Sequence, residues 1–211
     1  MVTSVNRLDS QPQNSHISLN TQSDVRKTAM FIQTEATPNP ATLKFLPGTT
    51  VMGHAGTANF VDAAAAGESP LALRLFDISG VDGVFLGSDF VTVTKGDGAG
   101  WDVVKPRVLA AIMDHFTQGE KVMNSAVADE SGEGDSDTVK QIKELIETRV
   151  RPAVAQDGGD IVFRSFEDGV VYLHMQGSCA GCPSSTATLK NGIENMLRHY
   201  VPEVQEVRAV N

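Results

Sequence analysis

Cysteine is scarce: the 211-residue chain contains only two, Cys179 and Cys182. Small secreted domains that depend on disulfides use more cysteines, joined across longer loops. The N-terminal residues also lack the basic start and apolar core of a secretory signal. These absences argue against a disulfide scaffold and predict a protein of a reducing compartment.

Basic residues are outnumbered, because 17 Lys and Arg stand against 26 Asp and Glu, a formal net charge of -9. Such an excess of acidic groups repels polyanions. Long apolar runs are missing too, and the longest are far shorter than the roughly 20 residues that cross a bilayer. We therefore expect a soluble protein that binds neither nucleic acid nor membrane.

Composition still supports folded domains, since 41% of the residues are hydrophobic and 20% are charged. This mixture excludes wholesale disorder and collagen-like fibres. Between Asp129 and Asp137 the chain carries five acidic residues with no basic and no apolar side chain, which is typical of a solvated linker. We predict a first domain over 30–119, a linker over 120–136 and a second domain over 137–211.

Residues 1–29 are rich in Ser, Thr, Asn and Gln and show no apolar periodicity. They are interpreted as a disordered tail or as an upstream extension before a start at Met30. A mitochondrial presequence is the alternative, because such peptides are basic and Ser-rich, although Asp9 and Asp24 count against it. We accordingly expect a bacterial cytoplasmic protein, with the mitochondrial matrix as the minor alternative.

The first domain is predicted to combine strands with two helices. Ser69-Pro70 provides a hydroxyl cap and a first-turn proline for a short helix. Apolar residues at helical spacing predict a second helix over 101–116. Alternation and turn signals predict strands over 31–35, 42–46, 84–86 and 90–94.

The second domain is predicted to begin with a helix capped by Asp137, and Pro152 is expected to bend or end its last turn. A hairpin follows, then a loop over 177–182, a helix from Pro183 and a closing strand. The predicted strands are 160–166, 170–175 and 204–210. The fold class is therefore α+β, as two small α+β domains joined by an acidic flexible linker.

Cys179 and Cys182 lie at the predicted junction of a strand and a helix, with Gly177 and Gly181 beside them. Two thiols separated by two residues can turn toward one point, and the glycines permit unusual backbone angles. The N-terminus of the following helix favours thiolate over thiol by about 0.3 to 1 kcal/mol. We therefore expect both thiols to bind metal or to react.

Two thiolates do not complete a metal site, because a 4Fe-4S cluster normally uses four cysteine ligands. A second subunit, related by a two-fold axis, would supply the missing pair. A cluster held between chains can leave when the subunits separate or when a client's thiols compete. This arrangement suits a carrier better than an electron-transfer protein.

The loop sequence resembles a known family. Gly177-Ser-Cys-Ala-Gly-Cys-Pro-Ser-Ser185, preceded by Asp157-Gly-Gly-Asp160, is similar to the C-terminal NifU-like domain of Nfu-type iron-sulfur proteins. Met-Phe-Ile-Gln-Thr-Glu-Ala-Thr-Pro-Asn-Pro at 30–40 and Ser-Gly-Val-Asp-Gly-Val-Phe at 79–85 resemble the N-terminal domain of Nfu proteins. The resemblance covers both domains, from about Met30 onward.

This resemblance implies assembly or transfer of an iron-sulfur cluster, usually 4Fe-4S with 2Fe-2S possible, through Cys179 and Cys182. It implies a carrier rather than an enzyme, a homodimer when the cluster is bound, upstream cluster donors and apo iron-sulfur client proteins. Larger NifU proteins carry further cysteine-bearing domains, for which this chain has no cysteines. The first domain would then be a client-recognition or docking module.

Two other interpretations of the same cysteines stay open. A thioredoxin-like dithiol oxidoreductase also places such a pair at a helix start, although normally after an early strand-helix unit. A structural zinc site shared between two chains, in an interaction module, needs the same number of ligands.

Other candidate residues are weaker. The glycine-rich segment 96–100 lacks the lysine and hydroxyl of a phosphate-binding loop. His174 is close enough in sequence to ligate a metal, but an alternating strand also accommodates a surface histidine. Asp157 and Asp160 flank a glycine pair, so helix termination is their default role. Trp101 and Met196 belong to apolar stripes and are expected in the cores.

Overall fold

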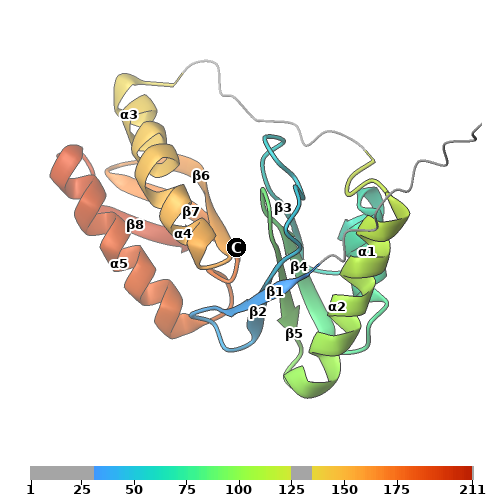
Figure 1. The fold of residues 1–211 in the computed structure, drawn as a ribbon. Helices are drawn as coiled ribbons and strands as arrows, with labels where there is room; N and C mark the ends of the chain where they lie inside the picture. Colours follow the sequence, from blue (N-terminus) through green and yellow to red (C-terminus); the bar gives the residue numbers. More distant parts are fainter. Residues whose placement is uncertain (1–30, 125–134, 211) are drawn as a thin grey trace, which may run out of the picture.

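The computed structural model describes residues 31–124 and 135–210, which form two α+β units (Figure 1). In each unit helices pack on a small sheet, so the predicted fold class is confirmed. The predicted tail and most of the predicted acidic linker lie outside the described residues. Within the described parts of the chain, no helix is both long enough and apolar enough to cross a membrane.

The first unit is a five-stranded sheet in which every neighbouring pair is antiparallel, in the order β1-β2-β5-β4-β3. A 3-10 turn, η1 (Ala65–Glu68), and helices α1 (Pro70–Phe76) and α2 (Trp101–Gln118) accompany it. The strands are β1 (Gln33–Ala36), β2 (Thr42–Leu46), β3 (Ala58–Phe60), β4 (Val81–Leu86) and β5 (Val91–Lys95).

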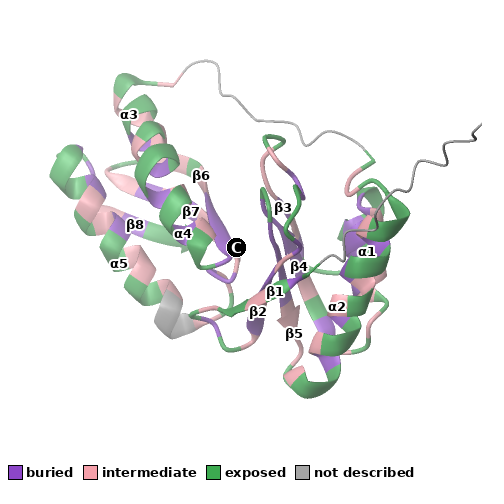
Figure 2. Ribbon diagram, viewed as in Figure 1, coloured by how far each residue is buried: buried purple, intermediate pink, exposed green. Residues whose placement is uncertain are grey.

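Strand alternation gives this sheet two different faces. Val91 and Val93 of β5 join Val104 and Val108 of α2 in one apolar core. Thr92 lies between the two valines and therefore points to the opposite face, yet it is completely buried. The second unit covers this face, which places the sheet between its own helices and the second domain (Figures 1 and 2).

The predicted start of α1 is confirmed in detail. Ser69 is the N-cap, its side chain accepts a hydrogen bond from the Ala72 amide, and Pro70 occupies the first turn. The Ser69 hydroxyl also donates to the Val122 carbonyl at 2.7 Å, and Met123 packs against the first core. Residues 120–124, which the sequence assigned to the linker, therefore lie on the first domain.

The second unit has helices on a three-stranded sheet in the order β6-β7-β8, with β6 and β7 antiparallel and β8 parallel to β7. Apolar residues of α3, α4 and α5 share one core with the sheet. The elements are α3 (Asp137–Leu145), a π-helical turn η2 (Ile146–Val150), α4 (Arg151–Gln156), β6 (Gly159–Glu167), β7 (Val170–Gly177), α5 (Pro183–Tyr200) and β8 (Glu206–Val210).

Two details of the first helix differ from the sequence prediction. Ser136, not Asp137, is the N-cap, and its hydroxyl accepts from the Val139 amide at 3.3 Å. The helix also continues past Pro152, because the π-helical turn comes immediately before it and Pro152 lies in the first turn of α4. A proline there removes no regular i to i-4 hydrogen bond, since the ladder has already been interrupted.

His115 is a buried titratable group in the first domain. Its side chain is completely buried in α2, with Nδ1 at 3.2 Å from a Glu120 carboxylate oxygen. Neither ring nitrogen makes a well-aligned hydrogen bond to another described residue. Burial lowers the pKa of His115, and Arg74 lowers it further, while Glu120 opposes both.

We expect the stability of the first domain to fall as the pH is lowered through the ordinary pKa of histidine. The unfolded chain binds a proton at His115 more readily than the folded chain, so acid favours unfolding. Urea unfolding at pH 7.5 and 5.5, followed by fluorescence of the single tryptophan, Trp101, measures this effect. His115→Phe should flatten the pH dependence, whereas His199→Gln, at an exposed residue of α5, should leave it unchanged. If the free energy of unfolding of His115→Phe depended on pH as strongly as that of the wild type, His115 would not be the group responsible.

Candidate functional site

Both cysteines lie in the loop that joins β7 to α5, as the sequence predicted for the strand-to-helix junction. Cys179 is buried, with 5% of its surface exposed, and Cys182 is half-buried. Cys182 is also the N-cap residue of α5, with Pro183 in the first turn. Neither cysteine is part of a disulfide, so the loop offers two thiols.

Two glycines give the loop its shape. Gly177 has φ 59° and Gly181 has φ 79°, values in the left-handed region that favours glycine. The amides of Cys179 and Ala180 donate to the carbonyls of Gln176 and Gly177 at 3.3 and 3.2 Å. The expected unusual backbone angles are therefore present on both sides of Cys179.

The Cys179 side chain packs into the core of the second domain, directly on the backbone of Gly159. A Cβ atom at Gly159 would lie 2.5 Å from Cys179 Sγ and 2.7 Å from the Gln176 carbonyl oxygen. The Thr186 hydroxyl of α5 donates to the Cys179 carbonyl at 3.1 Å. Cys179 is thus fixed from two elements of its own domain.

The pKa of the Cys179 thiol is raised from 9.0 to about 12, mainly by burial; a hydrogen bond with Ser178 opposes the shift, and the nearby carboxylates of Asp157 and Asp160 add to it. Three pKa units correspond to about 4 kcal/mol. The helix terminus contributes only about 0.3 to 1 kcal/mol in the other direction. The expectation of two ready thiolates is therefore wrong for Cys179, which is a protonated thiol at neutral pH.

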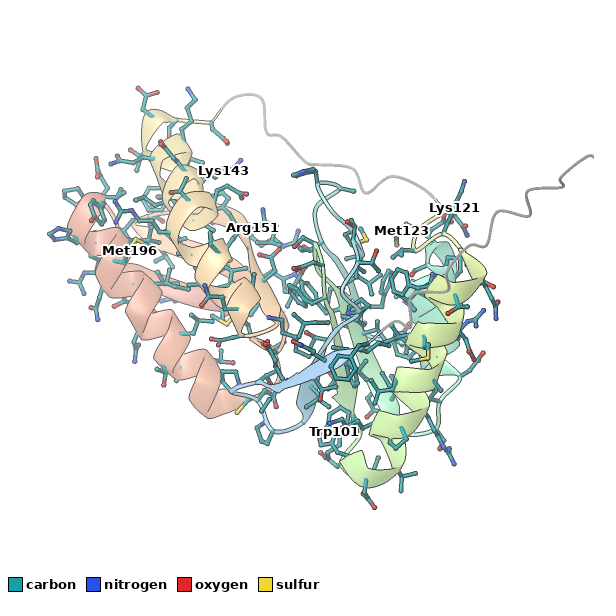
Figure 3. All side chains as sticks on the ribbon, in the orientation of Figure 1. Trp101, Lys121, Met123, Lys143, Arg151 and Met196 are labelled. Atoms are coloured by element: carbon teal, nitrogen blue, oxygen red, sulfur yellow. The ribbon has the colours of Figure 1, made fainter. Side chains whose placement is uncertain are left out.

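Asp160 has a different role from the helix termination that the sequence suggested. It is buried in β6, where its carboxylate accepts from Arg151 Nε and Nη2 at 2.8 and 2.7 Å. The Thr57 hydroxyl of the first domain donates to the same carboxylate at 2.7 Å. This bidentate pair raises the pKa of Arg151. Arg151 is labelled in Figure 3, and Asp157 is the C-cap residue of α4.

Four residues of the first domain hydrogen-bond to the segments around the cysteines, and one of them is Asn59, whose Oδ1 accepts from the Gly177 amide at 3.4 Å. Asn39 Nδ2 donates to the Ala180 carbonyl at 2.9 Å, Thr92 Oγ1 donates to the Gly158 carbonyl at 2.7 Å, and Lys44 Nζ donates to the Gln156 carbonyl at 3.0 Å. Asn39, Lys44 and Thr92 are all buried. Sequence reasoning missed them. Two signals were available in the sequence. Lys44 and Thr92 are polar residues in otherwise apolar strands, and Asn39 lies in the 37–40 turn, to which no contact with another domain had been assigned.

The other candidates do not join this site. His174 lies in β7 opposite Val162, and its Nδ1 is 3.0 Å from Arg164 Nη2. Burial and Arg164 both lower the pKa of His174. The 96–100 segment forms a turn closed by a hydrogen bond from the Ala99 amide to the Gly96 carbonyl. Over residues 31–124 and 135–210, no group of three or more His, Cys, Asp or Glu side chains is placed to hold a metal ion.

Comparison with known proteins agrees with this two-domain arrangement. Residues 32–119 match the N-terminal domain of the scaffold protein Nfu/NifU, and residues 142–208 match the NifU-like domain. The NFU1 iron-sulfur cluster scaffold homolog, mitochondrial, of Drosophila sechellia is 54% identical over 187 residues, which are 87% of this chain and 66% of that protein. The protein of the same description from Drosophila persimilis is 52% identical over 191 residues, covering 89% and 68%.

The chain therefore belongs to the Nfu/NifU family of scaffold proteins, as the loop and strand motifs indicated. It spans about two thirds of the length of these curated relatives. A solution structure of a NifU-like protein from Saccharomyces cerevisiae aligns with TM-score 0.43 and 22% identity, over 58% of this chain and 99% of that one. The two Drosophila relatives are described as mitochondrial, which does not support the expectation of a bacterial cytoplasm.

A methyl group at Gly159 should destabilise the second domain by about 1 to 3 kcal/mol, because it would overlap Cys179 Sγ and two backbone atoms. Gly192→Ala is the matched control. It lies in α5 with no atom within 4 Å of the added methyl, so it should stabilise the helix by about 1 kcal/mol. Urea unfolding followed by circular dichroism compares the two variants. If both substitutions changed the free energy of unfolding in the same direction, the tight contact at Gly159 would be contradicted.

Proposed function

We propose that this protein binds an iron-sulfur cluster between two copies of the chain, through Cys179 and Cys182 of each, and passes the cluster to apo-proteins. The observation that carries the proposal is one loop with two thiols that form no disulfide, in a described part of the chain that places no third His, Cys, Asp or Glu ligand with them. Family membership supports it, because the Drosophila relatives are described as iron-sulfur cluster scaffold homologs. A 4Fe-4S cluster is preferred, with 2Fe-2S as the alternative.

Ligand number and ligand type explain the shared site. A 4Fe-4S cluster takes four thiolates, so two chains with two thiolates each complete it without other ligands. Thiolate sulfur suits iron in such clusters better than carboxylate or hydroxyl oxygen does. Binding must displace the thiol protons, including that of the buried Cys179, because only the thiolate ligates metal.

Transfer follows from the same chemistry run in reverse. Thiolates of an apo client replace those of Cys179 and Cys182 on iron, and the carrier thiols regain their protons. The exchange changes ligands and leaves the oxidation state of the cluster unchanged, so it needs no oxidant or reductant. The protein therefore acts as a carrier between an upstream donor and a client rather than as an enzyme.

The state of Cys179 argues against the dithiol oxidoreductase. An attacking thiol in such an enzyme is accessible and has a lowered pKa. Cys179 is buried, and burial raises its pKa. A zinc site shared between two chains remains the second candidate, because it would use the same four thiolates. Metal analysis distinguishes it from the iron-sulfur carrier.

We further propose that the protein is located in mitochondria. This was the alternative location that the basic and Ser-rich N-terminal segment suggested. It rests on the description of the Drosophila relatives as mitochondrial. Donors and clients would then be mitochondrial iron-sulfur proteins.

Anaerobic reconstitution with iron and sulfide should give close to one 4Fe-4S cluster per two chains, in a dimer. Cys179→Ser and Cys182→Ser should each abolish stable binding, because a hydroxyl is a poor ligand for the cluster. Ala180→Ser is the matched control, since it adds a hydroxyl to the same loop and keeps both thiols. Iron and sulfide analysis, Mössbauer spectra and the mass of the holoprotein provide the measurements.

Three results would contradict this proposal. One is a complete cluster in a monomer, which would require ligands other than the two cysteines. Another is a stable cluster in either serine variant. The third is zinc in place of iron and sulfide in the purified dimer.

A further inference from the structure

The Thr37 to Pro40 turn of the first domain lies directly on the loop between the two cysteines. Asn39 donates from Nδ2 to the carbonyl of Ala180, the residue that follows Cys179. The nearest atom to a Cβ built at Gly181 is the same Asn39 Nδ2, at 3.9 Å. The turn therefore contacts this segment at the Ala180 carbonyl, while Gly181 itself stays exposed.

The turn is itself held in place by contacts within the first domain. The Ala41 amide donates to Asn39 Oδ1 at 3.0 Å, and the Asn39 amide donates to Thr37 Oγ1 at 3.2 Å. Trp101, labelled at the start of α2 in Figure 3, donates from its indole N–H to the Pro40 carbonyl at 3.3 Å. The Asn39 amide group is thus aimed by its own domain before it meets the loop.

A second set of contacts extends this interface across the sheet face. Thr92 donates to the Gly158 carbonyl, and a Cβ at Gly158 would lie 2.7 Å from Thr92 Oγ1. A Cβ at Gly177 would lie 2.9 Å from Phe85 Cγ. Both glycines also have positive φ, at 83° and 59°. The missing side chains at Gly158 and Gly177 therefore let the two domains approach as closely as they do.

This contact conflicts with a cluster shared between two chains. Four thiolates can reach one cluster only if the loops of both copies face each other at short range. The Asn39 turn holds the segment between the two cysteines by the Ala180 carbonyl, in a loop conformation that buries Cys179, while Gly181 stays exposed. Bringing both thiols of the loop to a cluster shared with a second copy therefore requires this contact to be released.

We propose that the sheet face of the first domain, formed by Asn39, Lys44, Phe85 and Thr92, is a docking surface for the cysteine loop of its own chain, and that docking and cluster binding exclude each other. The cluster part rests on the proposed function. In the apo monomer the first domain holds the loop by these contacts, and cluster loading releases it. Each neutral hydrogen bond changes the equilibrium between the docked and the open domains by only about fivefold, so docking is reversible.

Asn39→Asp combined with Thr92→Val should open the domains. The aspartate keeps the oxygen that accepts from the Ala41 amide but replaces the Nδ2 donor with an oxygen facing the Ala180 carbonyl. Valine removes the Thr92 hydroxyl at nearly constant volume. Thr94→Val is the matched control, because Thr94 follows two residues later on the same face of β5 and forms no hydrogen bond to the second domain within the described residues.

Small-angle scattering of the full-length apo chain measures the docking. The wild type and Thr94→Val should be compact, and the double variant should be extended, with an open population raised by about tenfold or more. Circular dichroism and Trp101 fluorescence check that the variants are folded; if the double variant is not, Thr92→Val alone takes its place. An extended wild type, or a double variant as compact as the control, would overturn the proposal.

Cluster loading then tests the exclusion. Under identical anaerobic reconstitution, the double variant should acquire its cluster absorbance several-fold faster than the wild type and the control. Equal rates in all three proteins, or a holoprotein in which the domains remain docked, would overturn the proposal while leaving the proposed function intact. Absence of a cluster in all three would instead refute the proposed function, and the exclusion with it.

Discussion

The packing of the Cys179 sulfur against the bare backbone of Gly159 is the contact on which the site depends. It sets the depth of Cys179 in the core, and that burial keeps the thiol protonated. It also explains why glycine occupies the first position of β6, since any side chain there would strike the sulfur and the backbone of the loop. The same contact therefore fixes both the position of Cys179 and the protonated state that its burial favours.

The glycines around the cysteines make room for side chains of both domains. Gly159 faces inward and makes room for Cys179, whereas Gly158 and Gly177 face outward and make room for Thr92 and Phe85 of the first domain. Motifs of this kind are usually interpreted in terms of the ligand alone. Here a single glycine-rich segment fits both the sulfur of its own domain and the sheet of its neighbour.

Local signals predicted much of the fold because they depend on residues close in sequence. The serine and proline at the start of α1, the hairpin of β4 and β5, and the helix after the cysteines are all determined within a few residues. The three-residue strand β3 is too short to alternate visibly, and it was missed. Ser136 and Asp137 are both good caps, so sequence alone did not decide between them.

The parts of the site that could not be predicted join distant segments. Asn39 and Ala180 are 141 residues apart, and Thr57 and Asp160 are 103 apart. Nothing in a turn or a threonine-rich strand indicates which carbonyl it will meet. The raised pKa of Cys179 was missed for the same reason, because local sequence shows the helix terminus but not the burial that outweighs it.

Under the proposed function, these long-range contacts bear on how firmly a cluster is held. Binding must remove the proton of a buried thiol and, under the proposed docking, also separate the first domain from the loop. Both steps subtract from the free energy of the iron-thiolate bonds, and both are recovered when the cluster departs. The apparent affinity is therefore lower than that of four exposed thiolates. Under the proposed carrier function, a stable empty state favours release of the cluster, and the buried thiol together with the proposed docking provides one.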